Sequence, residues 1–212
     1  MMKQKIVISH LLTEQELAII QFIHEFGFCD IHHIMRRFNI KRTVCYEKMR
    51  SLMRFGLLNF KVVLPHFPGV YFLTIKAVRL INADLSLLTY VPLNNYSHYM
   101  EVLKVYLKLH DKYPDSTWKT ERRLIKQKHE DMVGNKEHIP DGILILSDGK
   151  HIAIEVELSL KSRERLLGIL TDYVVDRSVY EVWYFCLPQV FTVVNSMAVT
   201  LPKIKTFFLN EK

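Results

Sequence analysis

Hydrophobic residues near the start of the chain recur at the spacing of an amphipathic helix. The helix is expected to begin at the capping-box sequence Thr13–Glu16, in which each side chain can accept a backbone hydrogen bond from the other residue. Gly27 follows the last residue of the pattern and is typical of a helix C-terminus. The positions expected to face the core are Leu17, Ile20, Ile23 and Phe26.

Two more helices and a hairpin are predicted before residue 80. Asp30 can cap a short helix, IHHIMRRF, that stops near Asn39, and a third helix is expected from about Lys41 to Gly56. The third helix is predicted to turn Val44, Met49, Leu52 and Met53 toward the core. The pattern then changes to LLNFKVVL, the turn residues PHFPG and VYFLT, which indicates a β-hairpin. Three helices followed by a hairpin predict a winged helix-turn-helix domain over residues 1–85.

The second half of the chain has a mixed pattern. Residues 82–96 have no sustained period and contain Pro92, so we place the domain boundary there. A helix is expected to about Tyr113, a short helical or irregular stretch from Trp118 to Ile125, and then alternating strands and helices. The expected order α-β-β-α-β-α-β predicts a small α/β domain over residues 95–212, and an α+β protein of two domains overall.

Composition narrows the class of protein. A hydrophobic fraction of 49% and a mean hydropathy of +0.05 suit a globular chain with a core. The sequence contains no run of 18 or more apolar residues, so no membrane span is predicted. Glu14 and Glu16 come too early for the apolar region of a signal peptide. The three cysteines, at 29, 45 and 186, form no zinc or disulfide pattern, so we expect a cytoplasmic location.

The net charge of +7 is concentrated in the first domain. Residues 1–90 contain 12 Lys and Arg against 6 Asp and Glu, whereas residues 91–212 contain 17 against 16. A basic cluster of this kind is expected where the partner is a polyanion, and its place on the third helix and hairpin favours duplex DNA. The alternative is a winged helix that binds protein instead. The predicted DNA-binding residues are Arg36, Arg37, Lys41, Arg42, Tyr46, Lys48, Arg50, Arg54 and Lys61.

The candidate chemistry lies in the second domain. Asp141 stands at the start of one predicted strand, and Glu155 and Glu157 lie two residues apart on the next, so both glutamates share one face. Their strand neighbours are apolar, and buried carboxylates are costly unless a cation compensates them. We therefore predict a divalent-metal site, for Mg²⁺ or Mn²⁺, on Asp141, Glu155 and Glu157. Lys161 follows four residues after Glu157 and is placed to reach the same site.

Pro140–Asp141 followed by Glu155–Val156–Glu157 resembles the PD-(D/E)XK core of restriction-endonuclease-like folds. In that motif an Asp and a Glu hold Mg²⁺ and a Lys helps to activate water. This sequence departs from the motif because Glu157 occupies the lysine position, so Lys161 would have to serve as a migrated lysine. Otherwise the acidic residues are a salt-bridged remnant of a nuclease fold.

More closely, the chain is similar to the replication-relaxation family and the related MobC-type plasmid relaxases, which join a winged helix to such a core. The resemblance covers about residues 12–175, and its most specific part is the Glu-x-Glu-x-x-x-Lys-Ser stretch from Glu155 to Ser162. Other matching stretches are Gly69–Thr74, Ser97–His98, Trp118–Arg122, Ile139–Gly142 and Arg165. The resemblance implies that Glu121 approaches the metal as a further carboxylate; the alternative is a surface acid paired with Arg122 or Arg123.

The resemblance implies a site-specific, metal-dependent DNA-nicking relaxase or relaxosome component of a mobile element. Asp141, Glu155, Glu157, Lys161 and Glu121 would form its catalytic site. Its partner would be an origin-like duplex site, with relaxosome proteins and a second copy of the chain as further partners and no membrane. The alternative function is a non-enzymatic regulator of plasmid replication or transfer, in which the second domain has a degenerate nuclease fold.

Overall fold

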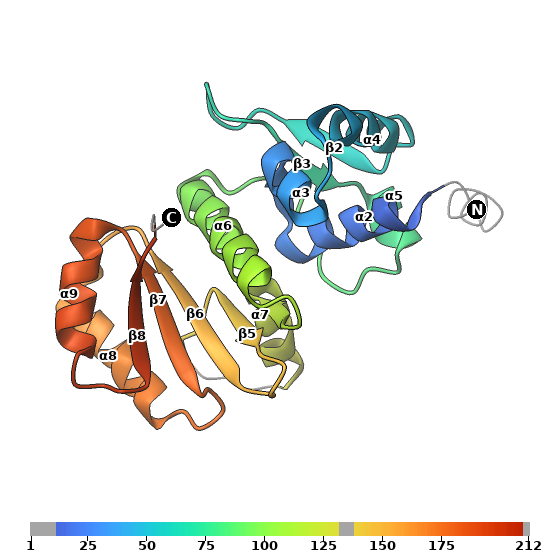
Figure 1. Cartoon of the computed structure of the whole chain (residues 1–212). Coiled ribbons are helices and arrows are strands. Elements are labelled where there is room, and N and C mark those ends of the chain that lie inside the picture. The colour runs from blue at the N-terminus through green and yellow to red at the C-terminus, as the bar shows by residue number, and fades with distance from the viewer. Residues whose placement is uncertain (1–11, 132–137, 210–212) are drawn as a thin grey trace. The chain divides into compact units, whose positions relative to one another are not determined.

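A computed structural model describes residues 12–131 and 138–209 of the chain. The chain divides into two compact units, Met1–Tyr96 and Ser97–Lys212. Figure 1 shows the helices of the first unit around a small sheet and those of the second around a larger one. The protein is therefore of the α+β class.

The helices of the first unit begin and end at the signals in the sequence. Thr13 caps the first of them by the predicted capping box, and Asp30 accepts a hydrogen bond from the His33 amide at 3.0 Å. Asn39 adopts the left-handed conformation that ends the next helix. The helices are α2 (Glu14–Phe26), α3 (Ile31–Phe38), α4 (Arg42–Arg54) and α5 (Ile75–Leu80), followed by a short 3₁₀ turn, η1 (Leu93–Asn95).

A three-stranded antiparallel sheet completes a winged-helix-like unit. The predicted hairpin is present as β2 (Leu58–Lys61) and β3 (Val70–Leu73), paired from Leu58–Leu73 to Lys61–Val70. The residues between them, 62–69, form the loop that we call the wing. A third strand, β1 (Phe28–Asp30), pairs with the other edge of β3 and was not predicted. With three residues it is too short to display an alternating pattern.

One prediction about α4 is wrong. Val44 is 43% exposed, and the buried residues of this helix are Cys45, Met49 and Leu52. Their spacing of four and then three residues defines the apolar stripe, which leaves Val44 about 100° away around the helix. Met53 is only half-buried.

The second unit is built on a mixed five-stranded sheet with the order β4-β5-β6-β7-β8. The pairs β4–β5 and β5–β6 are antiparallel, and the pairs β6–β7 and β7–β8 are parallel. The strands are β4 (Thr117–Thr120), β5 (Gly142–Ile145), β6 (His151–Glu157), β7 (Glu181–Cys186) and β8 (Ile204–Phe208). The helices are α6 (Tyr96–Lys112), α7 (Glu121–Glu130), α8 (Arg163–Val175) and α9 (Pro188–Ala198).

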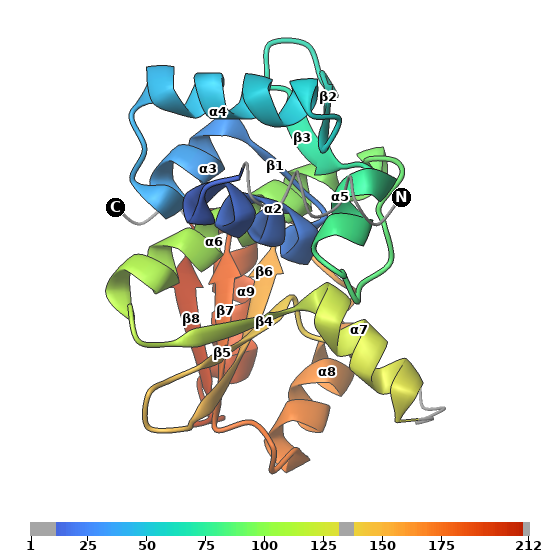
Figure 2. The same ribbon diagram turned by 90° about the vertical axis from the view of Figure 1, so that its right-hand side faces the viewer.

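Helices cover both faces of this sheet, as the two ribbon views show (Figures 1 and 2). On one face, Val102 and Val105 of α6 pack against alternate residues of β6, including Ile154. On the other face, Leu170 of α8 and Val194 of α9 pack in one core with β6 and β7. Glu155 and Glu157 point to this second face because they alternate with the residues under α6.

The segment from Trp118 to Ile125 differs from its prediction in its first part. Trp118 to Thr120 belong to strand β4, whereas Glu121 to Ile125 are helical, as the first residues of α7. Thr120 accepts a hydrogen bond from the Arg123 amide and so caps α7 directly after the strand. The order of the unit is therefore α-β-α-β-β-α-β-α-β instead of α-β-β-α-β-α-β. None of the helices in the described ranges combines the length and the apolar character that a membrane span requires.

Candidate functional site

The basic residues of the first unit are gathered along α4 and at its ends. Lys41, Arg42, Arg50 and Arg54 are exposed, whereas Tyr46 and Lys48 are half-buried. The Arg42 guanidinium lies 5.7 Å from the centre of the Tyr46 ring, within cation–π range. The helix therefore presents exposed cationic side chains at its start and, through Arg50 and Arg54, on the side away from its apolar stripe.

The other predicted DNA-binding residues lie at the end of α3 and at the base of the wing. Arg36 is exposed, and Arg37 is half-buried with its guanidinium 5.3 Å from the Phe38 ring centre. Lys61 is exposed at the end of β2. Helices α3 and α4, the residue before α4, and strand β2 thus carry all the predicted basic residues in one unit.

The wing is connected to α4 through Tyr71 of β3. Burial raises the pKa of the Tyr71 hydroxyl to about 12, and the neighbouring Tyr46 adds to the rise while Arg50 opposes it. Both helix residues therefore lie near the strand that leads out of the wing. Tyr46 and Arg50 of α4 thus lie on the side of the helix that is near β3.

In the second unit, Asp141 lies at the start of β5 and is held by two groups. Its Oδ2 accepts a hydrogen bond from the Val156 amide at 2.7 Å, which anchors it against β6. Its Oδ1 lies 2.8 Å from Nε2 of His98, a residue of α6. The Asp141 carboxylate is therefore fixed in position.

Glu155 lies on β6 and is 2% exposed. Its Oε1 lies 2.6 Å from Nε2 of His138, and it also accepts a hydrogen bond from the Tyr173 hydroxyl of α8. Tyr184, its pairing partner on β7, is buried with a hydroxyl that has no hydrogen-bond partner within the described part of the chain. Glu155 is the most deeply buried carboxylate of this site.

Glu157 and Lys161 form an ion pair. Glu157 is buried, and Lys161 lies between the end of β6 and Ser162, the N-cap of α8. Glu121 is half-buried at the first position of α7. We call Glu121, Asp141, Glu155, Glu157 and Lys161 the acidic cluster.

Electrostatic interactions connect members of the acidic cluster. Burial, and then the charge of Glu155, raise the pKa of Asp141 well above its usual range. The same two causes raise the pKa of Glu121. Burial lowers the pKa of Lys161, although Glu155 and Asp141 oppose that shift. Glu155 therefore lies close enough to Asp141, Glu121 and Lys161, which come from three other segments of the chain, for its charge to affect their pKa values.

The acidic cluster offers two carboxylates that suit Mg²⁺ but, among the described residues, no third protein ligand beside them. Mg²⁺ is commonly bound by one or two carboxylates together with water and substrate phosphates, and the repulsion between Asp141 and Glu155 is the kind that a cation relieves. However, no three His, Cys, Asp or Glu side chains among residues 12–131 and 138–209 are grouped so as to hold one ion. Asp141 and Glu155 could serve as two ligands, whereas Glu157 already pairs with Lys161.

Two residues of this site, His138 and Tyr173, were not assigned a functional role from the sequence. His98 and His138 each face a carboxylate, and Tyr173 donates to Glu155. His138 also lines, with Tyr173 and Asp176, a cavity of about 370 Å³ beside the cluster. Its position directly before Ile139-Pro140-Asp141 was a signal that could have identified it.

No protein-family model matches the sequence, and no curated protein matches it either. Among solved structures, the chain is similar to a mutant of ZitR from Lactococcus lactis in complex with DNA, at 17% identity and a TM-score of 0.31, over 57% of this chain and 73% of that one. It is also similar to the adhesin competence repressor AdcR from Streptococcus pyogenes, at 16% identity and a TM-score of 0.32, over 64% and 91%. These are distant likenesses, and we base the function on the residues of this chain.

Proposed function

We propose that this protein is a non-enzymatic DNA-binding regulator that binds duplex DNA through α4 and the wing. The observation that carries the proposal is the exposed row of cations on α4, in a unit with twelve basic and six acidic residues. In a helix-turn-helix the second helix enters the major groove while nearby cations contact phosphates. Arg42 and Arg50 are suited to those contacts because both are exposed and neither belongs to the apolar stripe. The resemblance noted in the sequence makes plasmid replication or transfer the process that it would regulate.

The test is the salt dependence of DNA binding by the full-length protein. Removing one phosphate contact should reduce the slope of log K against log salt by about 0.9. The Arg42→Glu/Arg50→Glu variant should therefore bind a 30-base-pair duplex more weakly and with a shallower slope in fluorescence anisotropy. The matched control is Arg163→Glu/Arg177→Glu, which makes the same change in net charge at two exposed residues of the second unit. Equal losses of affinity in both variants, or no binding by the wild type at low salt, would sink the proposal.

A second candidate function is metal-dependent DNA nicking at the acidic cluster. The observation that favours it is the position of buried Glu155 near Asp141 and Glu121, whose pKa values its charge raises, and near Lys161. Asp141 and Glu155 would hold Mg²⁺ or Mn²⁺, which would polarise the scissile phosphate and lower the pKa of a bound water. Lys161 would contribute a positive charge beside the two carboxylates, and His98 would hold Asp141 in place.

Metal binding and cleavage should be measured separately. Millimolar Mn²⁺ should raise the melting temperature of the wild type by mass action and support nicking of a supercoiled plasmid. Asp141→Ala should lose both effects and keep its DNA affinity, whereas Lys161→Ala should keep the thermal shift and lose nicking. Asp148→Ala, at an exposed turn, is the matched control. Wild-type nicking by an Asp141→Ala/Glu155→Ala double variant would exclude the cluster as the active site.

A further inference from the structure

The wing is an exposed loop of largely apolar composition. Residues 62–69 (VVLPHFPG) contain no Lys, Arg, Asp or Glu. Val62 is 61% exposed and Phe67 is 60% exposed. Phe60, on the strand that leads into the wing, is 47% exposed. A single exposed apolar side chain is common on protein surfaces. Whether these side chains form a binding element therefore depends on whether the backbone of the loop is ordered.

The tip of the wing is a defined turn. The Leu64 carbonyl accepts a hydrogen bond from the Phe67 amide at 3.4 Å, which closes a four-residue β-turn. Pro65 stands at its second position and His66, with φ of 66°, at its third, which is the pattern of a type II turn. Pro68 follows and fixes one more backbone angle. The loop therefore holds Phe67 without a large entropic cost of ordering it on binding.

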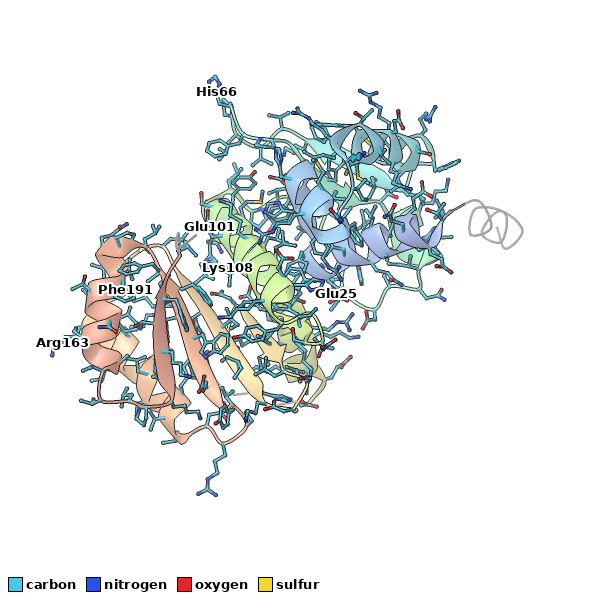
Figure 3. The ribbon with its side chains drawn as sticks, in the orientation of Figure 1. Glu25, His66, Glu101, Lys108, Arg163 and Phe191 are labelled. Carbon is cyan, nitrogen blue, oxygen red and sulfur yellow. The ribbon has the colours of Figure 1, made fainter. Side chains whose placement is uncertain are left out.

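The base of the wing is also braced. A Cβ atom at Gly69 would lie 2.3 Å from the Phe60 ring, so this ring lies directly against the backbone of the returning strand. The Phe60 and Tyr71 ring centres are 5.0 Å apart. Figure 3 shows His66 at the outer end of the loop, where the wing extends beyond the helices of its unit.

We propose that the wing is an apolar wedge, and that Phe67 inserts between base pairs from the minor groove when α4 binds duplex DNA. Apolar side chains such as Phe, Leu and Pro are used by minor-groove proteins to unstack a base step and kink the duplex. This inference rests on the DNA binding proposed above and adds to it the way in which the wing contacts DNA.

The charges around the wing favour DNA over a protein as its partner. The sequence from Lys48 to Ala83 contains six Lys and Arg and no Asp or Glu. An uncharged tip within such a segment complements a duplex, because the flanking cations can contact phosphates while the tip faces bases. The wing carries no arginine that could read a narrow minor groove by charge, so shape and stacking are what it offers.

The experiment compares wild type, Phe67→Ala and Ile75→Ala in the full-length protein. Ile75 is the matched control because it is 57% exposed in the same unit, at the start of α5. The probes are a duplex with several TpA steps, which are easily kinked, and a stiff A-tract duplex of the same length. Both carry end labels for energy transfer, and the first carries 2-aminopurine at the TpA steps.

Wild type and Ile75→Ala should raise the 2-aminopurine fluorescence and the energy transfer of the TpA duplex. Phe67→Ala should lose both signals, bind this duplex about tenfold more weakly and bind the A-tract duplex as before. If all three proteins bind the TpA duplex with equal signals, the wedge is wrong and the proposed DNA binding stands. If the wild type binds neither duplex, the proposed function fails and the wedge fails with it. If Phe67→Ala only dissociates a dimer in sedimentation, the wing is a protein contact and the wedge is wrong.

Discussion

Asp141 occupies a position that favours its neutral form more than the unfolded chain does. It is largely buried, it lies near Glu155, and the single backbone amide that stabilises its charge does not offset these effects. Its folded pKa is raised above the unfolded value. Its contribution to stability is therefore complete at low pH and is lost as the pH rises through the folded pKa.

Asp141→Asn should raise the melting temperature at pH 8 and change it little near pH 4. The asparagine oxygen can still accept from the Val156 amide, so the change removes charge and keeps the hydrogen bond. We expect a gain of about 1–2 kcal/mol, or about 2–8 °C, at the higher pH. Asp148→Asn is the control, and it should lower the melting temperature at pH 8, because its hydrogen bonds with Lys150 lower the pKa of Asp148. A gain that is largest at pH 4 would contradict the assignment.

For single residues, the sequence predicted which face of a strand a side chain occupies, but not its hydrogen-bond partners. The alternation along β6 places Glu155 and Glu157 on one face, as expected, because a strand has a period of two. The histidine partners of Asp141 and Glu155 are 43 and 17 residues away in the chain, and no local pattern connects them. The fold alone brings these pairs together.

At the scale of elements, long periodic segments were predicted well and short ones were not. The helices α2 and α3 have caps that can be read from the sequence, and α4, which has no side-chain cap, is recognised by its apolar period. The strand β4 has four residues, TWKT, and is followed at once by a helix, so neither period is sustained. Its strand character comes from pairing with β5, between Thr117–Ile145 and Thr120–Gly142.

Two glycine substitutions should have opposite effects on stability, one in the β4–β5 pair and one in α8. In Gly142→Ala the new Cβ would lie 2.2 Å from the Trp118 indole, so β4 would have to shift, at a cost of about 1–3 kcal/mol. Gly168→Ala in α8 has open space around it and should stabilise the protein by about 0.5–1 kcal/mol. Thermal melts of both variants test this pair. An unchanged melting temperature for Gly142→Ala would mean that Trp118 does not pack there.

At the scale of the whole molecule, charge and chemistry are divided between the two units. Residues 1–96 contain 12 basic and 6 acidic residues, and residues 97–212 contain 17 and 16. The first unit holds the candidate DNA interface, and the second holds the acidic cluster. Variants in one unit should therefore be informative about one activity at a time, and exposed residues of the second unit can serve as charge controls for α4.

The prediction that the division lies within residues 82–96 can be tested by limited proteolysis. Tyr90 is 67% exposed and Leu93 is 63% exposed, whereas residues 80–103 contain no Lys or Arg. Chymotrypsin should therefore cut first near Tyr90 and release fragments of about 90 and 120 residues, and trypsin should not cut there. The Tyr90→Arg variant should gain the same cut with trypsin, since it adds the residue that trypsin requires at an exposed position. Mass spectrometry of the first fragments measures both outcomes. First cuts within residues 140–160 by either protease would place the division elsewhere.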